Sequence, residues 1–146
     1  MRSWLLDTGP LVAYLDAGDS SHPAVSGHLD GFSGRLLTTS AVITEAMHFV
    51  TPSPGGPSLL VDFLTAGNVA ITDFSQPSEL YDAVSLMDKY RDTPMDYADA
   101  TLILLAEQLG VLEIATLDRR GFSAYRTRRG KPFVLVLDEV RASGPG

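Results

Sequence analysis

The sequence contains no cysteine, which excludes disulfide bonds, thiolate zinc sites and a thiol nucleophile. No apolar run approaches the roughly 20 residues that a membrane-spanning helix requires. The apolar stretch near the start ends at Asp7 and is too short for a secretory signal peptide. Because a chain without cysteine suits a reducing compartment, we expect a cytoplasmic protein without membrane association.

Basic residues are few and unevenly distributed. The net charge of −7 argues on its own against a polyanionic partner. Residues 1–118 contain four basic side chains against sixteen acidic ones, whereas residues 119–146 contain seven against two. Six basic residues lie within thirteen positions, namely Arg119, Arg120, Arg126, Arg128, Arg129 and Lys131. This basic cluster either forms a solvated loop or contacts the phosphates of a nucleic acid.

The length fits one domain. A chain of 146 residues buries roughly 68–70% of the surface that its unfolded form exposes, enough for a hydrophobic core of its own. No repeat, low-complexity tract or long linker divides the sequence. We therefore expect a single domain over residues 1–141 and a flexible tail from Ala142 to Gly146.

Strand and helix patterns alternate along the chain. Short apolar runs typical of strands occur at 3–6, 35–39, 69–71, 113–117 and 133–137. Helical spacing of apolar residues, with suitable caps, occurs at 10–16, 24–29, 41–50, 59–64, 78–90 and 97–109. Ser40 and Asp96 are the expected N-caps of the third and sixth helices. The alternation predicts a three-layer α/β/α sandwich with a central, mainly parallel sheet.

Four acidic residues occupy positions that such a fold brings together. Asp7 and Asp118 follow strands, and ligand sites of parallel sheets lie at the carboxyl ends of the strands. Glu45 and Asp99 lie on helices, and Asp96 is a secondary candidate. Clustered carboxylates repel one another unless they are protonated or bind a cation, and hard ions such as Mg²⁺ or Mn²⁺ prefer oxygen ligands. We therefore predict a divalent metal site.

Short motifs around these acids resemble the PIN domain over nearly the whole chain and in the correct order. They are Leu5-Leu6-Asp7-Thr8, Ser40 with Glu45 five residues later, Tyr97-Ala98-Asp99-Ala100, and Thr116-Leu117-Asp118 followed by Gly121-Phe122. The resemblance implies a parallel α/β/α sandwich and metal-dependent cleavage of single-stranded RNA. In prokaryotic members of the VapC type it also implies a toxin with an antitoxin partner, and a homodimer.

The resemblance also implies roles for individual residues. Asp7, Glu45 and Asp99 match the core metal-binding acids of the family, and Asp118 matches its more variable fourth acid. Thr8 and Thr116 match the hydroxyl residues that accompany the acids. Catalysis would use a water molecule activated by the metal, so no side-chain nucleophile is needed.

Simpler interpretations of the acids stay open at this point. Asp7 and Asp96 are suited to cap the helices that follow them, and Asp118 is suited to begin a turn. Glu45 could face solvent on an amphipathic helix. Glu45 and His48 form a Glu-x-x-His pair, but a di-iron bundle requires a second copy, which this sequence lacks.

Other functions fit the sequence less well. Asp7-Thr8-Gly9 is the triplet of aspartic proteases, but those enzymes are built almost wholly of strands. A receiver domain would need paired acids after the first strand and an acceptor aspartate after the third, and neither is evident. A solitary RNA-processing nuclease and a non-catalytic PIN-like binding module are the remaining alternatives.

Overall fold

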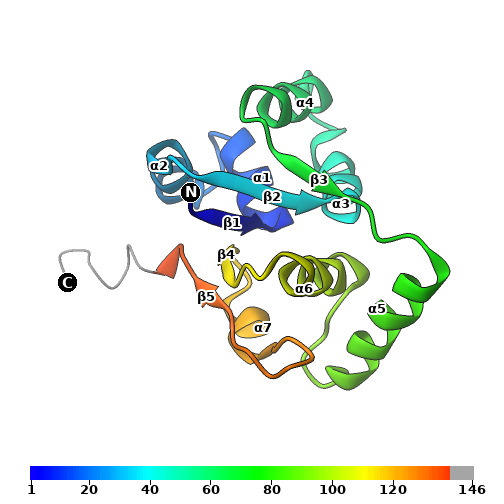
Figure 1. The fold of residues 1–146 in the computed structure, drawn as a ribbon. Coiled ribbons are helices and arrows are strands. Elements are labelled where there is room, and N and C mark those ends of the chain that lie inside the picture. Colours follow the sequence, from blue (N-terminus) through cyan, green and yellow to red (C-terminus); the bar gives the residue numbers. More distant parts are fainter. Residues whose placement is uncertain (139–146) are drawn as a thin grey trace.

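A computed structural model describes residues 1–138, and within them five strands form one parallel sheet (Figure 1). The strands are β1 (Ser3–Leu6), β2 (Arg35–Thr39), β3 (Ala70–Thr72), β4 (Glu113–Ala115) and β5 (Val134–Leu135). Their spatial order is β3-β2-β1-β4-β5, and every pair in the order is parallel. The predicted α/β/α fold class is confirmed.

Within residues 1–138, seven helices surround this sheet. They are α1 (Thr8–Leu15), α2 (His22–Gly31), α3 (Ser40–Val50), α4 (Gly56–Ala66), α5 (Pro77–Lys89), α6 (Tyr97–Leu109) and α7 (Arg119–Ala124). The chain first steps outward from β1 to β3 and then returns past β1 to β4 and β5. Because crossovers between parallel strands are right-handed, this reversal places α1 to α4 on one face and α6 and α7 on the other (Figure 1).

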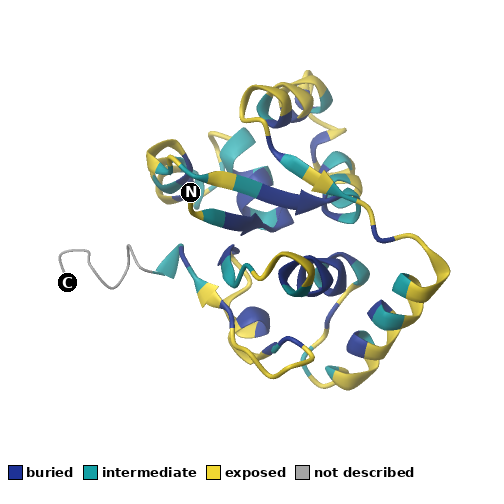
Figure 2. Cartoon of the chain, viewed as in Figure 1, coloured by how far each residue is buried: buried dark blue, intermediate teal, exposed yellow. Residues whose placement is uncertain are grey.

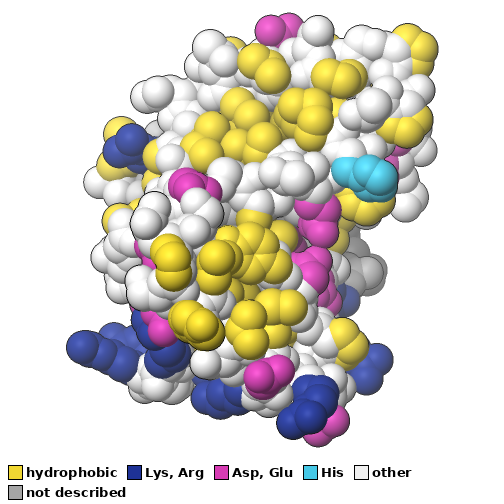
Figure 3. Space-filling view, turned by 90° about the vertical axis from the view of Figure 1, so that its right-hand side faces the viewer, with side chains coloured by type: hydrophobic (Ala, Val, Ile, Leu, Met, Phe, Trp, Pro, Cys, Tyr) yellow, Lys and Arg dark blue, Asp and Glu magenta, His cyan; other side chains and the backbone are white. Residues whose placement is uncertain are grey.

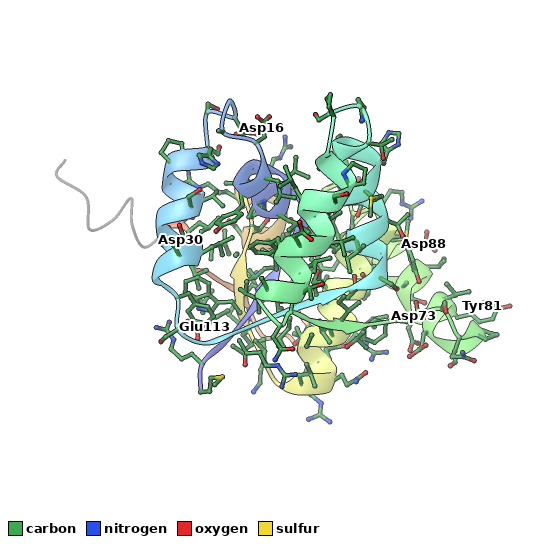
Figure 4. All side chains as sticks on the ribbon, turned by 90° about the horizontal axis from the view of Figure 1, so that it is seen from above. Asp16, Asp30, Asp73, Tyr81, Asp88 and Glu113 are labelled. Atoms are coloured by element: carbon green, nitrogen blue, oxygen red, sulfur yellow. The ribbon has the colours of Figure 1, made fainter. Side chains whose placement is uncertain are left out.

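The core is centred on the sheet and α6, as the dark segments of Figure 2 show. Most of α6 between Ala98 and Ala106 is buried, because the helix packs against β2, α3 and α5. By contrast, α5 buries only Ala83 and Leu86 and leaves Leu80, Tyr81 and Val84 exposed. In Figure 4, Tyr81 points away from the body of the protein at its outer edge.

Several predicted boundaries differ from the observed ones. Helix α4 begins at Gly56 rather than residue 59, because Pro57 lies in its first turn and Gly55 precedes it at a φ of 74°. Similarly, α2 includes Pro23 in its first turn. Strand β4 ends at Ala115, two residues before the predicted end, and β5 is shorter than predicted.

The predicted N-cap of α3 was wrong, and one helix was not predicted at all. Thr39, not Ser40, is the N-cap of α3, and its hydroxyl accepts a hydrogen bond from Val42 N at 3.3 Å. The Ser40 hydroxyl instead donates to Asp73 Oδ1. The sequence analysis also missed α7, because this six-residue helix buries only Gly121 and Phe122 and therefore shows no apolar period.

No helix within residues 1–138 has the length and apolar character needed to cross a membrane. The predicted tail, Ala142–Gly146, lies outside the described residues, as do residues 139–141 of the predicted domain.

Candidate active site

The candidate active site lies where the strand order reverses, between the carboxyl ends of β1 and β4. Asp7 directly follows β1, and its backbone N–H donates to the Ala115 carbonyl at 3.0 Å. Thr116 directly follows β4. In open parallel sheets this reversal leaves a crevice between the loops, and ligands bind there.

Asp7 is the most buried acid of the site, with 7% of its surface exposed. Its Oδ1 accepts a hydrogen bond from Thr8 N at 2.8 Å, which makes Asp7 the N-cap of α1. Its Oδ2 accepts a hydrogen bond from Thr116 Oγ1 at 2.7 Å. Burial, followed by repulsion from Asp96 and Glu45, raises the pKa of Asp7 to about 6 despite these hydrogen bonds. Asp7 therefore caps a helix and is also electrostatically part of an acidic cluster.

Asp99 and Asp96 occupy the first turn of α6. Asp96 is the N-cap, as predicted, and its Oδ1 accepts from Asp99 N at 2.8 Å. Asp99 Oδ2 accepts from Asp96 N at 3.1 Å, which completes a reciprocal capping box. Burial, followed by repulsion from Asp7 and Asp96, raises the pKa of Asp99 to about 8. Because Asp7 raises the pKa of Asp99, the structure brings these two predicted site residues together.

Glu45 lies on α3 and is half-buried rather than fully exposed to solvent. Burial raises its pKa, and contact with Asp96 raises it further. A pair of buried hydroxyls lies between α6 and the start of α3, the helix that carries Glu45. Thr39 Oγ1 is 2.8 Å from Thr101 Oγ1 on α6. The sequence analysis did not single out this pair, which ties the helix of Glu45 to the helix of Asp99.

Asp118 is exposed and lies at the other side of the site. Its Oδ1 accepts from Gly121 N at 3.0 Å, so Asp118 is the N-cap of α7. Its backbone N–H donates to Thr116 Oγ1 at 3.0 Å. The Thr116 hydroxyl therefore joins Asp118 to Asp7, in keeping with the supporting role predicted for Thr116.

Tyr125 is a buried neighbour of the acids that the sequence analysis missed. Burial and then repulsion from four acids raise its pKa, so that its hydroxyl stays protonated; these acids are Asp99, Asp118, Asp96 and Asp7. The sequence offered no signal for this role, since Tyr125 only follows Gly121-Phe122 at the end of a short helix.

The donor chemistry of the site suits a hard divalent cation. All the candidate ligands are carboxylate or hydroxyl oxygens, and the pKa values of Asp7, Glu45 and Asp99 are raised first by burial and then by neighbouring acids. The Thr8 hydroxyl is buried and forms no hydrogen bond with the described residues, although it lies close enough to Glu45 to lower the pKa of that carboxyl. Within residues 1–138, however, no group of three or more Asp, Glu or His side chains is arranged to hold a metal ion.

Helix N-termini add to the electrostatics of the site. Helices α1, α3, α6 and α7 all begin at this edge of the sheet, with Asp7, Thr39, Asp96 and Asp118 as their N-caps. The positive end of a helix dipole favours negative charge nearby, so these four starts partly offset the repulsion among the carboxylates.

The basic cluster is divided between two edges of the sheet. Arg119 and Arg120 follow β4 and lie at the carboxyl edge of the sheet, where the acids are. Arg119 Nε lies 3.2 Å from Asp138 Oδ1 there. Residues 126–131 precede β5 and lie toward the opposite edge. Arg128 is paired there with Glu107 at 2.8 Å, and Glu107 is about 12 Å along α6 from Asp99. On the face shown in Figure 3, acidic side chains lie between two apolar patches. Most of the Lys and Arg side chains visible on this face lie along its lower margin.

Solved structures share this fold at low sequence identity. VapC20 of Mycobacterium tuberculosis, described as a Sarcin-Ricin loop cleaving toxin, aligns with a TM-score of 0.70 and 15% identity, over 79% of this chain and 89% of that one. VapBC2 of Rickettsia felis, bound to a promoter DNA fragment, aligns with a TM-score of 0.61 and 17% identity, over 92% and 97%. FitAcB of Neisseria gonorrhoeae aligns with a TM-score of 0.54 and 20% identity, over 78% and 86%.

Sequence comparison identifies the family, which a shared fold at low sequence identity does not establish. No family model matches the chain. Ribonuclease VapC26 of Mycobacterium tuberculosis is 32% identical over 133 residues, which cover 90% of this chain and 98% of that protein. With this identity over nearly the full length of both chains, and with the same fold in VapC structures, the protein belongs to the VapC family of PIN-domain proteins.

Proposed function

We propose that the protein is a divalent-metal-dependent endoribonuclease that hydrolyses phosphodiester bonds in single-stranded RNA in the cytoplasm. The observation that carries the proposal is the electrostatic coupling of Asp7 and Asp99 at the point where the strand order reverses. A relative that shares 32% of its residues is named a ribonuclease, which supports the same activity.

Asp7, Glu45, Asp99 and Asp118 would hold Mg²⁺ or Mn²⁺ after drawing closer together than they lie in residues 1–138 without the ion, and Asp96 would be a secondary ligand. When bound, such an ion activates water for attack and stabilises the charge that develops on the phosphodiester. Within the chain, Thr116 donates to Asp7 Oδ2 and so fixes the rotation of that carboxylate. The Thr8 hydroxyl, buried and unpartnered within residues 1–138, is available to the same region.

The raised pKa values give two of these acids different protonation states at neutral pH. With a pKa of about 8, Asp99 is mainly protonated at pH 7, while Asp7, with a pKa of about 6, is mainly charged. A cation requires the charged carboxylates, so its binding releases protons and weakens as the pH falls. We expect RNA cleavage to lose activity on the acidic side for this reason.

RNA phosphates are proposed to contact the basic cluster, in which Arg119 and Arg120 lie at the edge of the acids. The other members, Arg126, Arg128, Arg129 and Lys131, precede β5 and would contact a strand only where it continues away from the site. Arg128 would also have to give up its pairing with Glu107 and Asp82. Phosphate contacts position the strand and do not read its sequence.

We further propose that the protein is the toxin of a toxin–antitoxin pair, is covered by an antitoxin protein, and forms a homodimer. Solved structures of the same fold are named as VapBC and FitAB complexes, which supports an antitoxin partner. A DNA-binding antitoxin encoded beside this gene would favour the toxin role over a solitary RNA-processing nuclease. Sedimentation of the purified protein tests the homodimer.

The experiment that tests the activity is cleavage of labelled single-stranded RNA with Mg²⁺ or Mn²⁺ and with EDTA. Wild-type protein should cut only with metal, and Asp7→Asn and Asp99→Asn should abolish cutting. Asp88→Asn, an exposed acid on α5, is the matched control and should cut normally. Folded wild-type protein that cuts none of several RNAs would favour a non-catalytic binding module, and cutting that survives both site variants would exclude this site.

A further inference from the structure

Tyr125 reaches the segment that leads into the Asp96–Asp99 capping box. It is fully buried, at 0% exposed, and its hydroxyl donates to the Pro94 carbonyl at 2.7 Å, with a longer contact of 3.4 Å to the Thr93 carbonyl. Within residues 1–138, no other side chain donates to either carbonyl. Pro94 is two residues from Asp96, so this hydrogen bond fixes the chain directly before the N-cap of α6.

On the side that faces Asp118, the ring of Tyr125 packs closely against its neighbours. It makes edge contacts with Tyr90 and Phe122, with ring centroids 5.1 Å apart in each case. Gly121 lies between the Asp118 carboxylate and this ring. A Cβ atom at Gly121 would overlap Asp118 Oδ2 and lie 3.0 Å from Tyr125 Cε2, so there is no free space between the two side chains.

We propose that Tyr125 is a positioning residue that fixes Asp96 and Asp99 relative to Asp118. One rigid ring touches both acid-bearing segments, which are otherwise separated by α6 and β4 in the chain. The hydroxyl acts through the Pro94 carbonyl and touches no acid itself. The catalytic consequence rests on the proposed function, whereas the geometric one does not.

Tyr125→Phe tests this role, because it removes the hydroxyl and keeps the ring. Tyr90→Phe is the matched control, since its hydroxyl accepts from Arg126 N at 2.9 Å and does not contact residues 93–94 through a side-chain hydrogen bond. Amide hydrogen exchange at Asp99 should become about five- to tenfold faster in Tyr125→Phe only, the size expected for one lost hydrogen bond. Mn²⁺ should bind more weakly in the same variant, and kcat for RNA should fall with KM unchanged.

Gly121→Ala provides a second test that does not depend on the folding of Tyr125→Phe. The added methyl group overlaps the Asp118 carboxylate and also crowds the Tyr125 ring from the α7 side, and neither Asp96 nor Asp99 is among its three nearest neighbours. Asp118→Ala removes that carboxylate without crowding the ring, so faster exchange at the Asp99 amide in Gly121→Ala but not in Asp118→Ala would have to be transmitted through Tyr125.

The outcomes separate this inference from the proposed function. If the wild type neither binds Mn²⁺ nor cuts RNA, the proposed function fails, and exchange at Asp99 still decides the role of Tyr125. Unchanged Asp99 exchange in Tyr125→Phe and Gly121→Ala, or an equal change in Tyr90→Phe, overturns the positioning role.

Discussion

The Thr116 hydroxyl donates to Asp7 Oδ2 at 2.7 Å across the gap between the first and fourth strands. The hydroxyl oxygen of Thr116 also accepts a hydrogen bond from the Asp118 backbone N–H at 3.0 Å. A residue that is 1% exposed therefore uses its one hydroxyl to connect two acids from opposite ends of the sequence. Removing this hydroxyl should therefore change the pKa of Asp7 directly.

Thr116→Val should destabilise the protein and make it more sensitive to acid. The substitution keeps the shape and leaves a buried carboxylate oxygen unsatisfied, which costs about 1–3 kcal/mol. Because the Thr116 hydrogen bond lowers the pKa of Asp7, its loss should raise that pKa above about 6 and shift the acidic limb of the activity profile to higher pH. Urea unfolding and a pH–rate profile measure the two effects. Thr116→Ser, which keeps the hydroxyl, should behave like the wild type in both.

The stability of the metal-free protein should fall as the pH rises from about 4 to 8. The folded pKa values of Asp7 and Asp99 are raised to about 6 and about 8, so the folded state holds protons that the unfolded state has released. Each group lowers the free energy of unfolding by at most about 1.4 kcal/mol per pH unit within its window. Urea unfolding in EDTA at several pH values measures this slope.

Asp99→Asn should make the same stability profile flatter between pH 6 and 8, because the variant lacks the group with the highest pKa. Asp88→Asn should keep the wild-type slope. A profile that is steeper in Asp99→Asn, or a wild-type stability that increases over this range, would contradict the assignment of raised pKa values.

Adding Mg²⁺ or Mn²⁺ should raise the melting temperature, and the rise should be larger at pH 8 than at pH 6. A metal at 100 times its Kd stabilises the folded state by about 2.7 kcal/mol, and protons compete with it at the lower pH. Differential scanning calorimetry with and without the metal measures the rise. Asp7→Asn should lose most of it, and an undiminished rise in that variant would move the ion to another site.

Charge reversal should distinguish the two parts of the basic cluster. On an Asp99→Asn background, which should bind RNA without cutting it, Arg119→Glu and Arg120→Glu should weaken RNA binding. Each lost phosphate contact should reduce the salt slope by about 0.7, the value for single strands. Fluorescence anisotropy at several salt concentrations measures both quantities.

The corresponding reversals at Arg128 and Arg129 test whether the opposite edge takes part. Arg128→Glu breaks the pairing with Glu107 and Asp82, so its stability has to be measured beside its affinity. Arg129→Glu serves as the cleaner variant of the two. Unchanged RNA binding in Arg129→Glu would limit the phosphate contacts to the edge of the acids.

The sequence was sufficient to predict the parallel sheet, its helical layers and the acids at its carboxyl edge, because strand-to-helix alternation is a local signal. It was not sufficient to choose between Thr39 and Ser40 as the N-cap of α3. Both hydroxyl residues suit the position, and the choice depends on how far β2 pairs with β3, which continues to Thr39. That pairing involves residues more than thirty positions apart.

Tyr125 and the Thr39–Thr101 hydroxyl pair were missed for a related reason. Tyr125 acts on Pro94, and Thr39 on Thr101, across 31 and 62 positions of sequence. Neither contact has a short-range motif, because the partners are backbone carbonyls or common hydroxyl residues. The acids were easier to single out as candidates. Asp7 and Asp118 follow strands, and Asp96 and Asp99 lie at the start of a helix.

The contact between Asp7 and Thr116 also has a consequence for protein synthesis. Asp7 leaves a ribosome well before its hydroxyl partner, which is 109 positions later, and Tyr125 follows later still. A nascent chain that ends within α6 holds Asp7, Glu45 and Asp99 without β4, Thr116 or Asp118. The acidic cluster therefore assembles only after translation has passed β4, Thr116 and Asp118, which delays any activity of this site until long after Asp7 has been made.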